Sequence, residues 1–264
     1  YRSMMSVQSS LVMYPIYAYG SEEQRKKYLP KLASGEFIGC FGLTEPDAGS
    51  DPAGMKTVAK KTADGYVLNG SKLYITSAEY AGVFVVWAVT DKDAPKGKGI
   101  SCFLVEAGTP GLVIGKAEKK MGQTGSATNE VHFENCRVPA SAVMGEVGKG
   151  YKIAIETLNE GRIGIGAQMV GLAQGALDHT LRYVQEREQF GRPIGHFQGV
   201  QFQLAEMATK IEAARLLVYN AARLKDAGED FVLEAAQAKL FSSQIAQEVA
   251  STAIDLYGGY GFTR

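Results

Sequence analysis

The chain has 264 residues, 45% of them apolar, which is enough for a substantial hydrophobic core in one large domain or two smaller ones. Its 28 Lys and Arg residues balance its 28 Asp and Glu residues, so we expect no nucleic-acid partner held by bulk positive charge. The three cysteines, Cys40, Cys102 and Cys136, lie far apart, which indicates reduced thiols and argues against a disulfide or zinc framework.

Residues 1–36 have a helical pattern with interruptions. Ser21 to Gln24 matches a capping box, in which the Ser hydroxyl and the Gln amide each satisfy a free backbone group, so we expect a helix to begin there. Pro30 suits the first turn of another helix, where the missing N–H of proline needs no partner.

From residue 37 to residue 145 the pattern changes to short stretches of β-branched and aromatic residues. The expected strands lie within Phe37–Leu43, Tyr66–Leu68, Leu73–Thr76, Val83–Val89, Ile100–Val105 and Val131–Phe133. Asn69-Gly70 is a strong signal for a tight hairpin turn. The sequence therefore predicts a small antiparallel β domain, either a barrel or a sandwich. The longest apolar run, Ala81 to Val89, is far shorter than the roughly 20 residues that cross a bilayer, so we expect no integral membrane segment.

After residue 145 the apolar spacing becomes helical. Two stripes are visible, formed by Val170, Leu177, Leu181 and Val184 and by Val200, Leu204, Met207 and Ile211. A third, alanine-rich helix is expected from about Phe231 to Tyr257. Three long amphipathic helices predict a bundle, whose surplus of apolar surface would also suit a neighbouring subunit. The expected fold class is α+β, with domains at 1–36, 37–145 and 146–264.

The stretch from Phe41 to Gly54 is the most informative part of the chain. Pro46, Pro52 and several glycines interrupt it after an expected strand, so it forms a loop whose backbone a ligand can approach closely. Thr44, Ser50 and free backbone N–H groups supply donors for a phosphate or a polar ring edge. On composition alone, an ordinary loop closed by Asx and Ser/Thr turns is the more common explanation.

Four motifs occur in the same order as in a known family. Gly42-Leu-Thr-Glu-Pro-Asp-Ala-Gly-Ser-Asp-Pro-Ala-Gly54 resembles the signature of the acyl-CoA dehydrogenases, and other motifs of that family are matched by Lys72–Thr76, Arg187–Gly191 and Gly258–Phe262. The resemblance covers nearly the whole chain. It implies that residues 1–36 end an N-terminal helical domain, that a middle β domain follows, and that the C-terminal domain is like a four-helix bundle. It also implies a fragment that lacks most of the first domain and the C-terminal end.

The function implied by the resemblance is FAD-dependent α,β-dehydrogenation of a short- or branched-chain acyl-CoA to the trans-2-enoyl-CoA, as in fatty acid β-oxidation. Electrons would pass to an electron-transferring flavoprotein. A homotetramer is implied, because the flavin site of the family is shared between subunits. The expected location is the cytoplasm in a bacterium or the mitochondrial matrix in a eukaryote.

The first part of the implied flavin site lies in the middle domain. Its expected contacts are Phe41, Leu43, Thr44, Gly49, Ser50, Tyr74, Ile75 and Thr76. The ring of Tyr74 would offer a flat apolar face, and Thr76 a hydroxyl. Without the resemblance, ordinary strand packing is the simpler explanation of Tyr74 and Ile75.

The second part lies in the C-terminal domain and would reach the flavin of an adjacent subunit. Its expected contacts are Arg187, Phe190, Gln198, Asp255, Gly258 and Gly259. Arg187 would fork a pyrophosphate, although by itself it is also a typical cation at a helix C-terminus. Many relatives carry Gln where this chain has Asp255, and an acid beside a pyrophosphate is unfavourable unless its contact lies elsewhere.

The implied acyl-CoA site uses Ser50 and the segment Asn159-Glu160-Gly161-Arg162, although Arg162 is equally well explained as an exposed helix residue. A buried carboxylate with a raised pKa would suit the removal of the Cα proton. One branch of the family has its catalytic Glu at the place of Gly161, and Glu160 is about 100° round the helix from it. The other branch has that Glu beyond the last motif. We therefore expect no catalytic base in the chain and place the catalytic Glu beyond Arg264.

Two other readings remain open. An acyl-CoA oxidase or a nitroalkane-oxidase-like relative would share the fold and pass electrons to oxygen. A non-catalytic scaffold of the same family would lack the chemistry altogether. The histidines are not spaced as metal ligands, so we expect no metal site; they are His132, His179 and His196.

Overall fold

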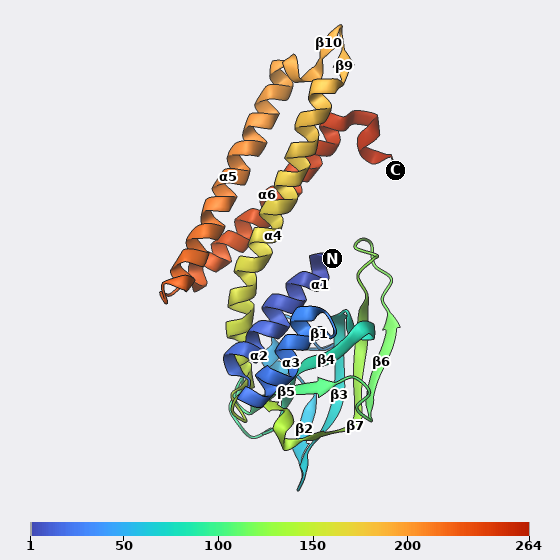
Figure 1. Cartoon of the computed structure of the whole chain (residues 1–264), viewed down its shortest axis with the longest axis vertical. Helices are drawn as coiled ribbons and strands as arrows, with labels where there is room; N and C mark the ends of the chain where they lie inside the picture. The colour runs from blue at the N-terminus through green and yellow to red at the C-terminus, as the bar shows by residue number, and fades with distance from the viewer. Residues whose placement is uncertain (1, 264) are drawn as a thin grey trace. The chain divides into compact units, whose positions relative to one another are not determined.

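The computed structural model describes residues 2–263. The chain divides into two compact units, Tyr1–Leu158 and Asn159–Arg264 (Figure 1). Helix α4 (Gly150–Glu186) begins in the first unit and continues into the second. The boundary predicted after residue 145 lies in the turn between β8 (Val143–Met144) and α4.

The first unit opens with helical segments: α1 (Arg2–Ser6), a π-helical stretch (Val7–Met13), α2 (Tyr14–Tyr19) and α3 (Glu22–Ser34). The predicted capping box is confirmed, because Ser21 Oγ accepts from Gln24 N at 3.2 Å and Gln24 Oε1 accepts from Ser21 N at 3.0 Å. The prediction for Pro30 was wrong, since this residue lies inside α3. Tyr28 and Leu32 on either side of it are buried in the core, and this packing outweighs the cost of a proline in a helix.

A single eight-stranded sheet forms the rest of the first unit. Its strands are β1 (Ile38–Gly42), β2 (Val58–Lys61), β3 (Gly65–Thr76), β4 (Ala81–Val89), β5 (Ile100–Glu106), β6 (Leu112–Ala117), β7 (Thr128–Pro139) and β8. The order is β6-β7-β3-β2-β4-β5-β8, and β1 also pairs with β4. Most neighbouring strands pair antiparallel as predicted, but the sheet is mixed, because β1 and β2 both run parallel to β4. Such pairings join strands that are distant in sequence, and local turn signals do not reveal them.

Two hydrophobic cores lie on opposite faces of this sheet, and β4 contributes alternate residues to both. The core enclosed by the sheet takes Phe84, Val86 and Ala88. The core shared with the N-terminal helices takes Val83, Val85 and Trp87. Leu112 and Val143, from the two end strands, pack against the same enclosed core, so the sheet is curled in the manner of a barrel.

The hairpin predicted at Asn69-Gly70 does not exist. Both residues lie inside β3, which pairs with β7 on either side of them. An irregularity in the pairing falls here, and Asn69 Oδ1 accepts the backbone N–H of Asn135 at 2.9 Å. A Cβ on Gly70 would lie 2.6 Å from the Cα of Thr57, so the glycine serves a close approach of β3 to the residue before β2 and not a turn.

The second unit contains three long helices among its described residues, namely α4 from residue 159 onward, α5 (Gln198–Asp226) and α6 (Val232–Tyr257). A short hairpin of β9 (Glu188–Gln189) and β10 (Arg192–Pro193) joins the first two. The predicted helical stripes are confirmed, since Val170, Leu177, Met207 and Ile211 are buried in one core. The bundle gives Arg187 a fixed place at the end of α4.

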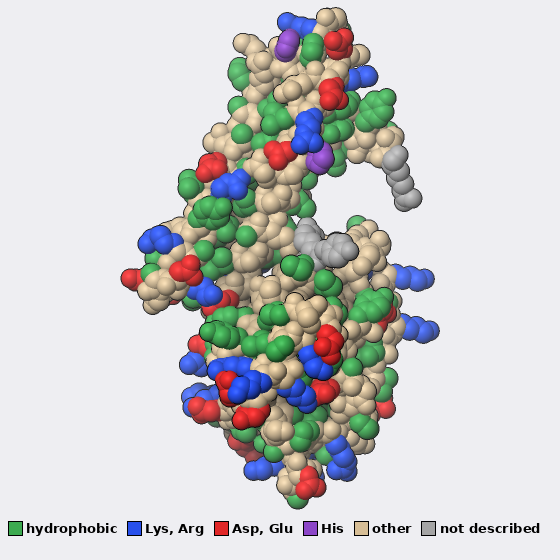
Figure 2. All heavy atoms as spheres, in the orientation of Figure 1, with side chains coloured by type: hydrophobic (Ala, Val, Ile, Leu, Met, Phe, Trp, Pro, Cys, Tyr) green, Lys and Arg blue, Asp and Glu red, His purple; other side chains and the backbone are tan. Residues whose placement is uncertain are grey.

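Basic and acidic side chains are interspersed on the face shown in Figure 2. Several charged side chains of the first unit form ion pairs, as Lys27 does with Glu106 at 2.5 Å. Within residues 2–263, no helix has the length and apolar character needed to cross a bilayer.

Candidate functional site

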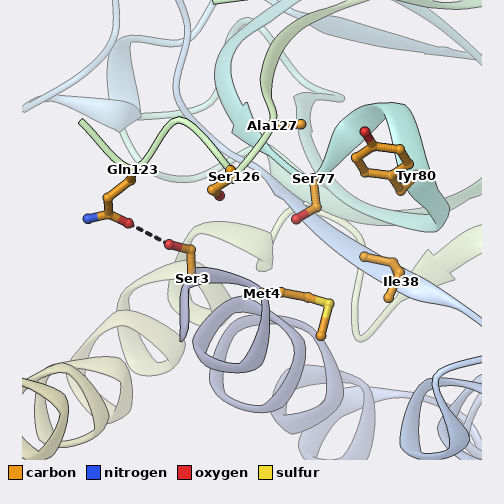
Figure 3. A pocket seen from close by; sticks show the side chains of 9 residues that line it. Ser3, Met4, Ile38, Ser77, Tyr80, Gln123, Ser126 and Ala127 are labelled. Atoms are coloured by element: carbon orange, nitrogen blue, oxygen red, sulfur yellow. Dashed lines mark hydrogen bonds between the residues drawn. The ribbon is translucent and has the colours of Figure 1, made fainter. Parts of the chain in front are cut away.

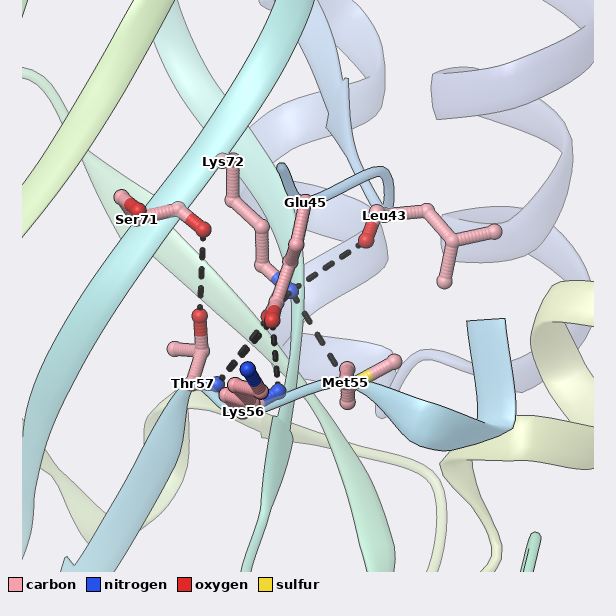
Figure 4. Close-up of polar contacts among 7 residues, drawn as sticks. All are labelled: Leu43, Glu45, Met55, Lys56, Thr57, Ser71 and Lys72. Carbon is pink, nitrogen blue, oxygen red and sulfur yellow. Dashed lines mark hydrogen bonds and ion pairs between the residues drawn. The ribbon is translucent and has the colours of Figure 1, made fainter. Parts of the chain in front are cut away.

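The signature loop (residues 43–57) leaves β1 and returns to β2, and a buried ion pair holds its base. Lys72 Nζ, from β3, lies 2.7 Å from Glu45 Oε1 and donates to the carbonyl of Leu43 at 3.3 Å (Figure 4). The carboxylate of Glu45 also accepts the backbone N–H groups of Lys56 at 2.5 Å and Thr57 at 3.1 Å. One side chain therefore ties the two ends of the loop together.

A second motif segment, Lys72 to Thr76, lies directly beside this loop. The backbone N–H of Leu73 donates to the carbonyl of Thr44 at 2.9 Å, and Cys40 Sγ lies 3.1 Å from the carbonyl of Thr76. The two predicted flavin segments of the middle domain are thus neighbours, although nearly thirty residues separate Thr44 from Leu73 in the sequence.

Some of the predicted flavin residues of this unit are buried and others are exposed to solvent. Leu43 and Ile75 are buried in the cores, and Phe41 packs against Trp87 with ring centroids 4.5 Å apart. Any contact that Leu43 or Ile75 makes with a ligand would therefore involve its backbone. Gly49, Ser50 and Tyr74 are exposed, and Thr44 and Thr76 are half-buried.

Tyr74 has an unusual backbone conformation. Its φ is +59°, in the left-handed region that residues with a Cβ rarely adopt, and 63% of its surface is exposed. The pairing of β3 with β7 is irregular between Lys72 and Ile75, which lets the chain turn the ring outward while Ile75 returns to the core. Such strain in an exposed aromatic residue is typical of a binding site.

A cavity of about 550 Å³ opens next to this segment, between α1 and the loop before β7 (Figure 3). It is lined by Ser3, Met4, Ile38, Ser77, Tyr80, Gln123, Gly125, Ser126 and Ala127. Ser77 follows Thr76 directly and donates its N–H to Ala127 O at 2.9 Å. The lining mixes hydroxyls with apolar side chains, as a pocket for an amphipathic ligand requires.

In the second unit, Arg187 follows α4 immediately. The N–H of Ile194 donates to its carbonyl at 2.8 Å and closes the β9–β10 hairpin. Phe190, in that hairpin, is 94% exposed with φ +54°, and Gln198 is the exposed first residue of α5. All three predicted residues therefore lie around one exposed corner of the bundle.

A cavity of about 480 Å³ joins Arg187 to the last motif. Tyr183, Tyr257, Gly258 and Gly259 are among the residues that line it. Asp255 is not: its side chain lines a separate cavity of about 240 Å³ between α5 and α6, with Lys210 and Glu248. Asp255 is therefore not among the residues that line the cavity containing Arg187.

The predicted acyl-CoA segment lies on α4 in the second unit, whereas Ser50 belongs to the first. Arg162 donates to Asn159 Oδ1 at 2.6 Å. The carboxylate of Glu160 is mostly buried and forms an ion pair with Lys225 of α5. Glu160 therefore forms a contact between α4 and α5. Within residues 2–263, no cluster of His, Cys, Asp and Glu side chains suits a metal ion.

Two features of these sites were missed from the sequence. The burial of Lys72 was missed because it depends on contacts with Leu43 and Glu45, although its place in the Lys72–Thr76 motif was a usable signal. The stacking of Tyr183 on Tyr257, with centroids 4.1 Å apart, joins residues on two helices and has no sequence signal.

Three family models match consecutive parts of the chain, namely the acyl-CoA dehydrogenase N-terminal domain (residues 1–36), middle domain (40–136) and C-terminal domain (148–264). A probable short/branched chain specific acyl-CoA dehydrogenase of Dictyostelium discoideum is 52% identical over 99% of this chain and 63% of its own length. An acryloyl-CoA reductase (NADH) of Anaerotignum propionicum is 50% identical over 94% of this chain and 64% of its own length.

The fold also matches a solved structure. Butyryl-CoA dehydrogenase from Megasphaera elsdenii is 46% identical, with a TM-score of 0.95, and the match covers 99% of this chain and 68% of that one. Of the Dictyostelium and Anaerotignum relatives, by contrast, the chain spans less than two thirds of the length.

Proposed function

The chain belongs to the acyl-CoA dehydrogenase family, and we propose that the protein containing it is an FAD-dependent enzyme that desaturates a short- or branched-chain acyl-CoA at its α,β bond. The observation that carries the proposal is the hydrogen bond from Leu73 N to Thr44 O at 2.9 Å. It joins the signature loop to the Tyr74–Thr76 segment, so that two motifs distant in sequence form one surface.

The residues on this surface fit a flavin. Tyr74 presents an exposed ring, Thr44 and Thr76 bring hydroxyls, and Gly49 has open space around the position where a Cβ would lie. A flat aromatic face beside donors suits the apolar body and polar edge of an isoalloxazine ring. When bound, FAD supplies the acceptor for the two electrons that leave the substrate as hydride.

The remaining roles fall to residues outside that surface. Arg187 would hold the pyrophosphate of FAD from an adjacent subunit, with Gly258 and Gly259 leaving room for it beside the ring of Tyr257. Ser50, exposed on the loop, would contact the thioester end of the substrate. The base for the Cα proton would be a carboxylate from another part of the protein, because Gly161 has no side chain and Glu160 is paired with Lys225.

A homotetramer and an electron-transferring flavoprotein partner complete the proposal. In support of subunit contacts, α5 and α6 expose large apolar side chains, including Phe202, Leu216, Leu233 and Leu240, each at least 60% exposed. The mass of the purified protein by light scattering tests the assembly. We expect a cytoplasmic location in a bacterium and the mitochondrial matrix in a eukaryote.

The visible spectrum of the full-length protein, before and after anaerobic addition of butyryl-CoA, tests the function. A flavin band that bleaches on addition supports the dehydrogenase. A band that stays unbleached with butyryl-CoA and with branched acyl-CoAs contradicts the proposed substrate class. Absence of a flavin band after incubation with FAD contradicts the enzyme reading and favours a scaffold.

Two further assays separate the related activities. Rapid peroxide formation in air with the acyl-CoA would indicate an oxidase instead. One relative at 50% identity is named an acryloyl-CoA reductase (NADH). The second assay therefore measures NADH oxidation with and without a 2-enoyl-CoA. Oxidation that requires the 2-enoyl-CoA would indicate that this protein reduces it to the saturated thioester. The dehydrogenase proposal expects neither result.

A further inference from the structure

We propose that the buried pair of Lys72 and Glu45 is a positioning device, which fixes the signature loop against the Tyr74–Thr76 segment in the geometry that FAD requires. This inference rests on the proposed function and names two residues to which no role in that function has been given. Both belong to family-like motifs in the sequence, yet neither is exposed to a ligand, since their side chains are 0% and 4% exposed.

Glu45 closes the loop at its base. Its carboxylate accepts hydrogen bonds from Lys72 Nζ of β3 and from the N–H groups of Lys56 and Thr57, the last two residues of the loop (Figure 4). The backbone of Glu45 also pairs with that of Ala48 at 3.1 Å in both directions. The exposed part of the loop, with Gly49 and Ser50, is therefore held at both ends by one carboxylate.

Lys72 holds this closed loop to the second segment. Its ammonium donates to the carbonyl of Leu43, one residue before Thr44, while its neighbour Leu73 donates to the carbonyl of Thr44. Tyr74, two residues after Lys72, has its ring turned outward by its backbone φ of +59°. A shift of Lys72 would therefore move Thr44 and Tyr74 relative to each other, and both are among the positions proposed to contact the flavin.

The chemistry of the pair suits positioning better than stability. Replacing a buried ion pair by apolar groups of similar volume is often neutral or stabilising, because desolvation offsets the attraction of the charges. Hydrogen bonds are directional, however, and those between this ammonium or carboxylate and nearby backbone groups fix the position of the loop. Burial lowers the pKa of the Lys72 ammonium to about 8 in spite of the attraction of Glu45, so the ammonium remains largely charged at neutral pH.

Four variants of the full-length protein test the inference. Glu45→Gln and Lys72→Met each remove one charge, and the double variant removes both at nearly constant volume. Leu68→Ala is the matched control. Leu68 is fully buried in β3 but lies in the core enclosed by the sheet, whereas Lys72 contacts Leu43 and Met55 of the core shared with the N-terminal helices. The measurements are the dissociation constant of FAD at a temperature well below every melting temperature, the visible spectrum of the bound flavin, and the melting temperature without FAD.

The double variant gives the decisive comparison. We expect it to melt close to wild type but to bind FAD about tenfold or more weakly, with an altered flavin spectrum. Leu68→Ala should melt lower and bind FAD as wild type does. A purely structural pair would give the opposite result, with FAD affinity unchanged in every variant that is folded at the assay temperature.

The outcomes separate the two proposals. If wild type binds FAD and the folded double variant binds it with the same affinity and spectrum, the positioning role is wrong but the proposed function stands. If the double variant does not fold, Lys72→Met decides in the same way, because it removes the bond to the Leu43 carbonyl while Glu45 keeps its two backbone N–H donors. Wild type that takes up no FAD overturns the proposed function and this inference with it.

Discussion

Tyr183 of α4 and Tyr257 at the end of α6 stack with their ring planes 11° apart, and each hydroxyl bonds to the backbone of the other helix. Tyr183 OH donates to Tyr257 O at 3.2 Å, and Tyr257 OH donates to His179 O at 3.1 Å. The stack lies in the wall of the cavity that contains Arg187 and Gly258. It therefore holds the segment that begins at Gly258 against the last turns of α4, next to Arg187.

Removal of the Tyr257 ring should loosen this corner of the bundle. We expect Tyr257→Ala to lower the free energy of unfolding by about 2 kcal/mol, because a half-buried ring and its stacking are lost. Tyr257→Phe keeps the stack and should cost about 1 kcal/mol for one hydrogen bond. Urea unfolding of both variants checks the order, and equal losses would show that the stack contributes nothing.

Arg187→Gln should weaken FAD binding. Loss of a charged hydrogen-bond fork to a pyrophosphate costs about 1.5–3 kcal/mol, which corresponds to roughly ten- to a hundredfold in the dissociation constant. Arg182→Gln is the matched control, since Arg182 is also exposed on the last turns of α4. Titration with FAD, followed by flavin fluorescence, should show a loss for Arg187→Gln only. Equal affinities of the two variants would remove Arg187 from the site.

Tyr74→Gly should separate folding from binding. Glycine adopts a φ of +59° without strain, so the stability of the protein without FAD should change by less than about 1 kcal/mol. FAD affinity should fall, because the exposed ring is gone. Tyr74→Phe, which keeps the ring, should bind FAD nearly as wild type does. Unchanged affinity in Tyr74→Gly would mean that the ring does not contact the flavin.

Glu45 should make the folded state less stable at acid pH than at neutral pH. Burial by itself raises the pKa of this carboxyl, but the charge of Lys72 and the hydrogen bonds from Lys72, Thr57 and Lys56 outweigh it and hold the pKa below 4.5. A carboxyl with a lower pKa in the folded state stabilises the fold above its unfolded pKa, and that contribution is lost as the pH falls through the folded pKa.

The difference in unfolding free energy between wild type and Glu45→Gln should therefore change little between pH 6 and about pH 5 and should narrow below 4.5. Urea unfolding at several pH values from 6 down to about 3 measures it, and all other carboxylates cancel in the comparison. A difference that stays constant over this whole range would mean that the Glu45 carboxylate is not stabilised by its partners.

The sequence by itself determined much of this protein. The change from helical to strand-like and back to helical apolar spacing gave the α+β class, because these periods follow from local backbone geometry. The motifs from Gly42 to Gly54 and from Gly258 to Phe262 identified the family, which the matching family models and the structural match confirm. The capping box at Ser21 was also predictable, because both of its bonds join residues three positions apart.

Only the tertiary structure decided the features that depend on distant neighbours. Three features override local signals: the parallel pairing of β1 with β4, the continuation of β3 through Asn69-Gly70 and the continuation of α3 past Pro30. The burial of Lys72 against Glu45 and the stack of Tyr183 on Tyr257 join residues 27 and 74 positions apart. Packing and desolvation act between side chains that the fold brings together, and local sequence patterns carry no record of those contacts.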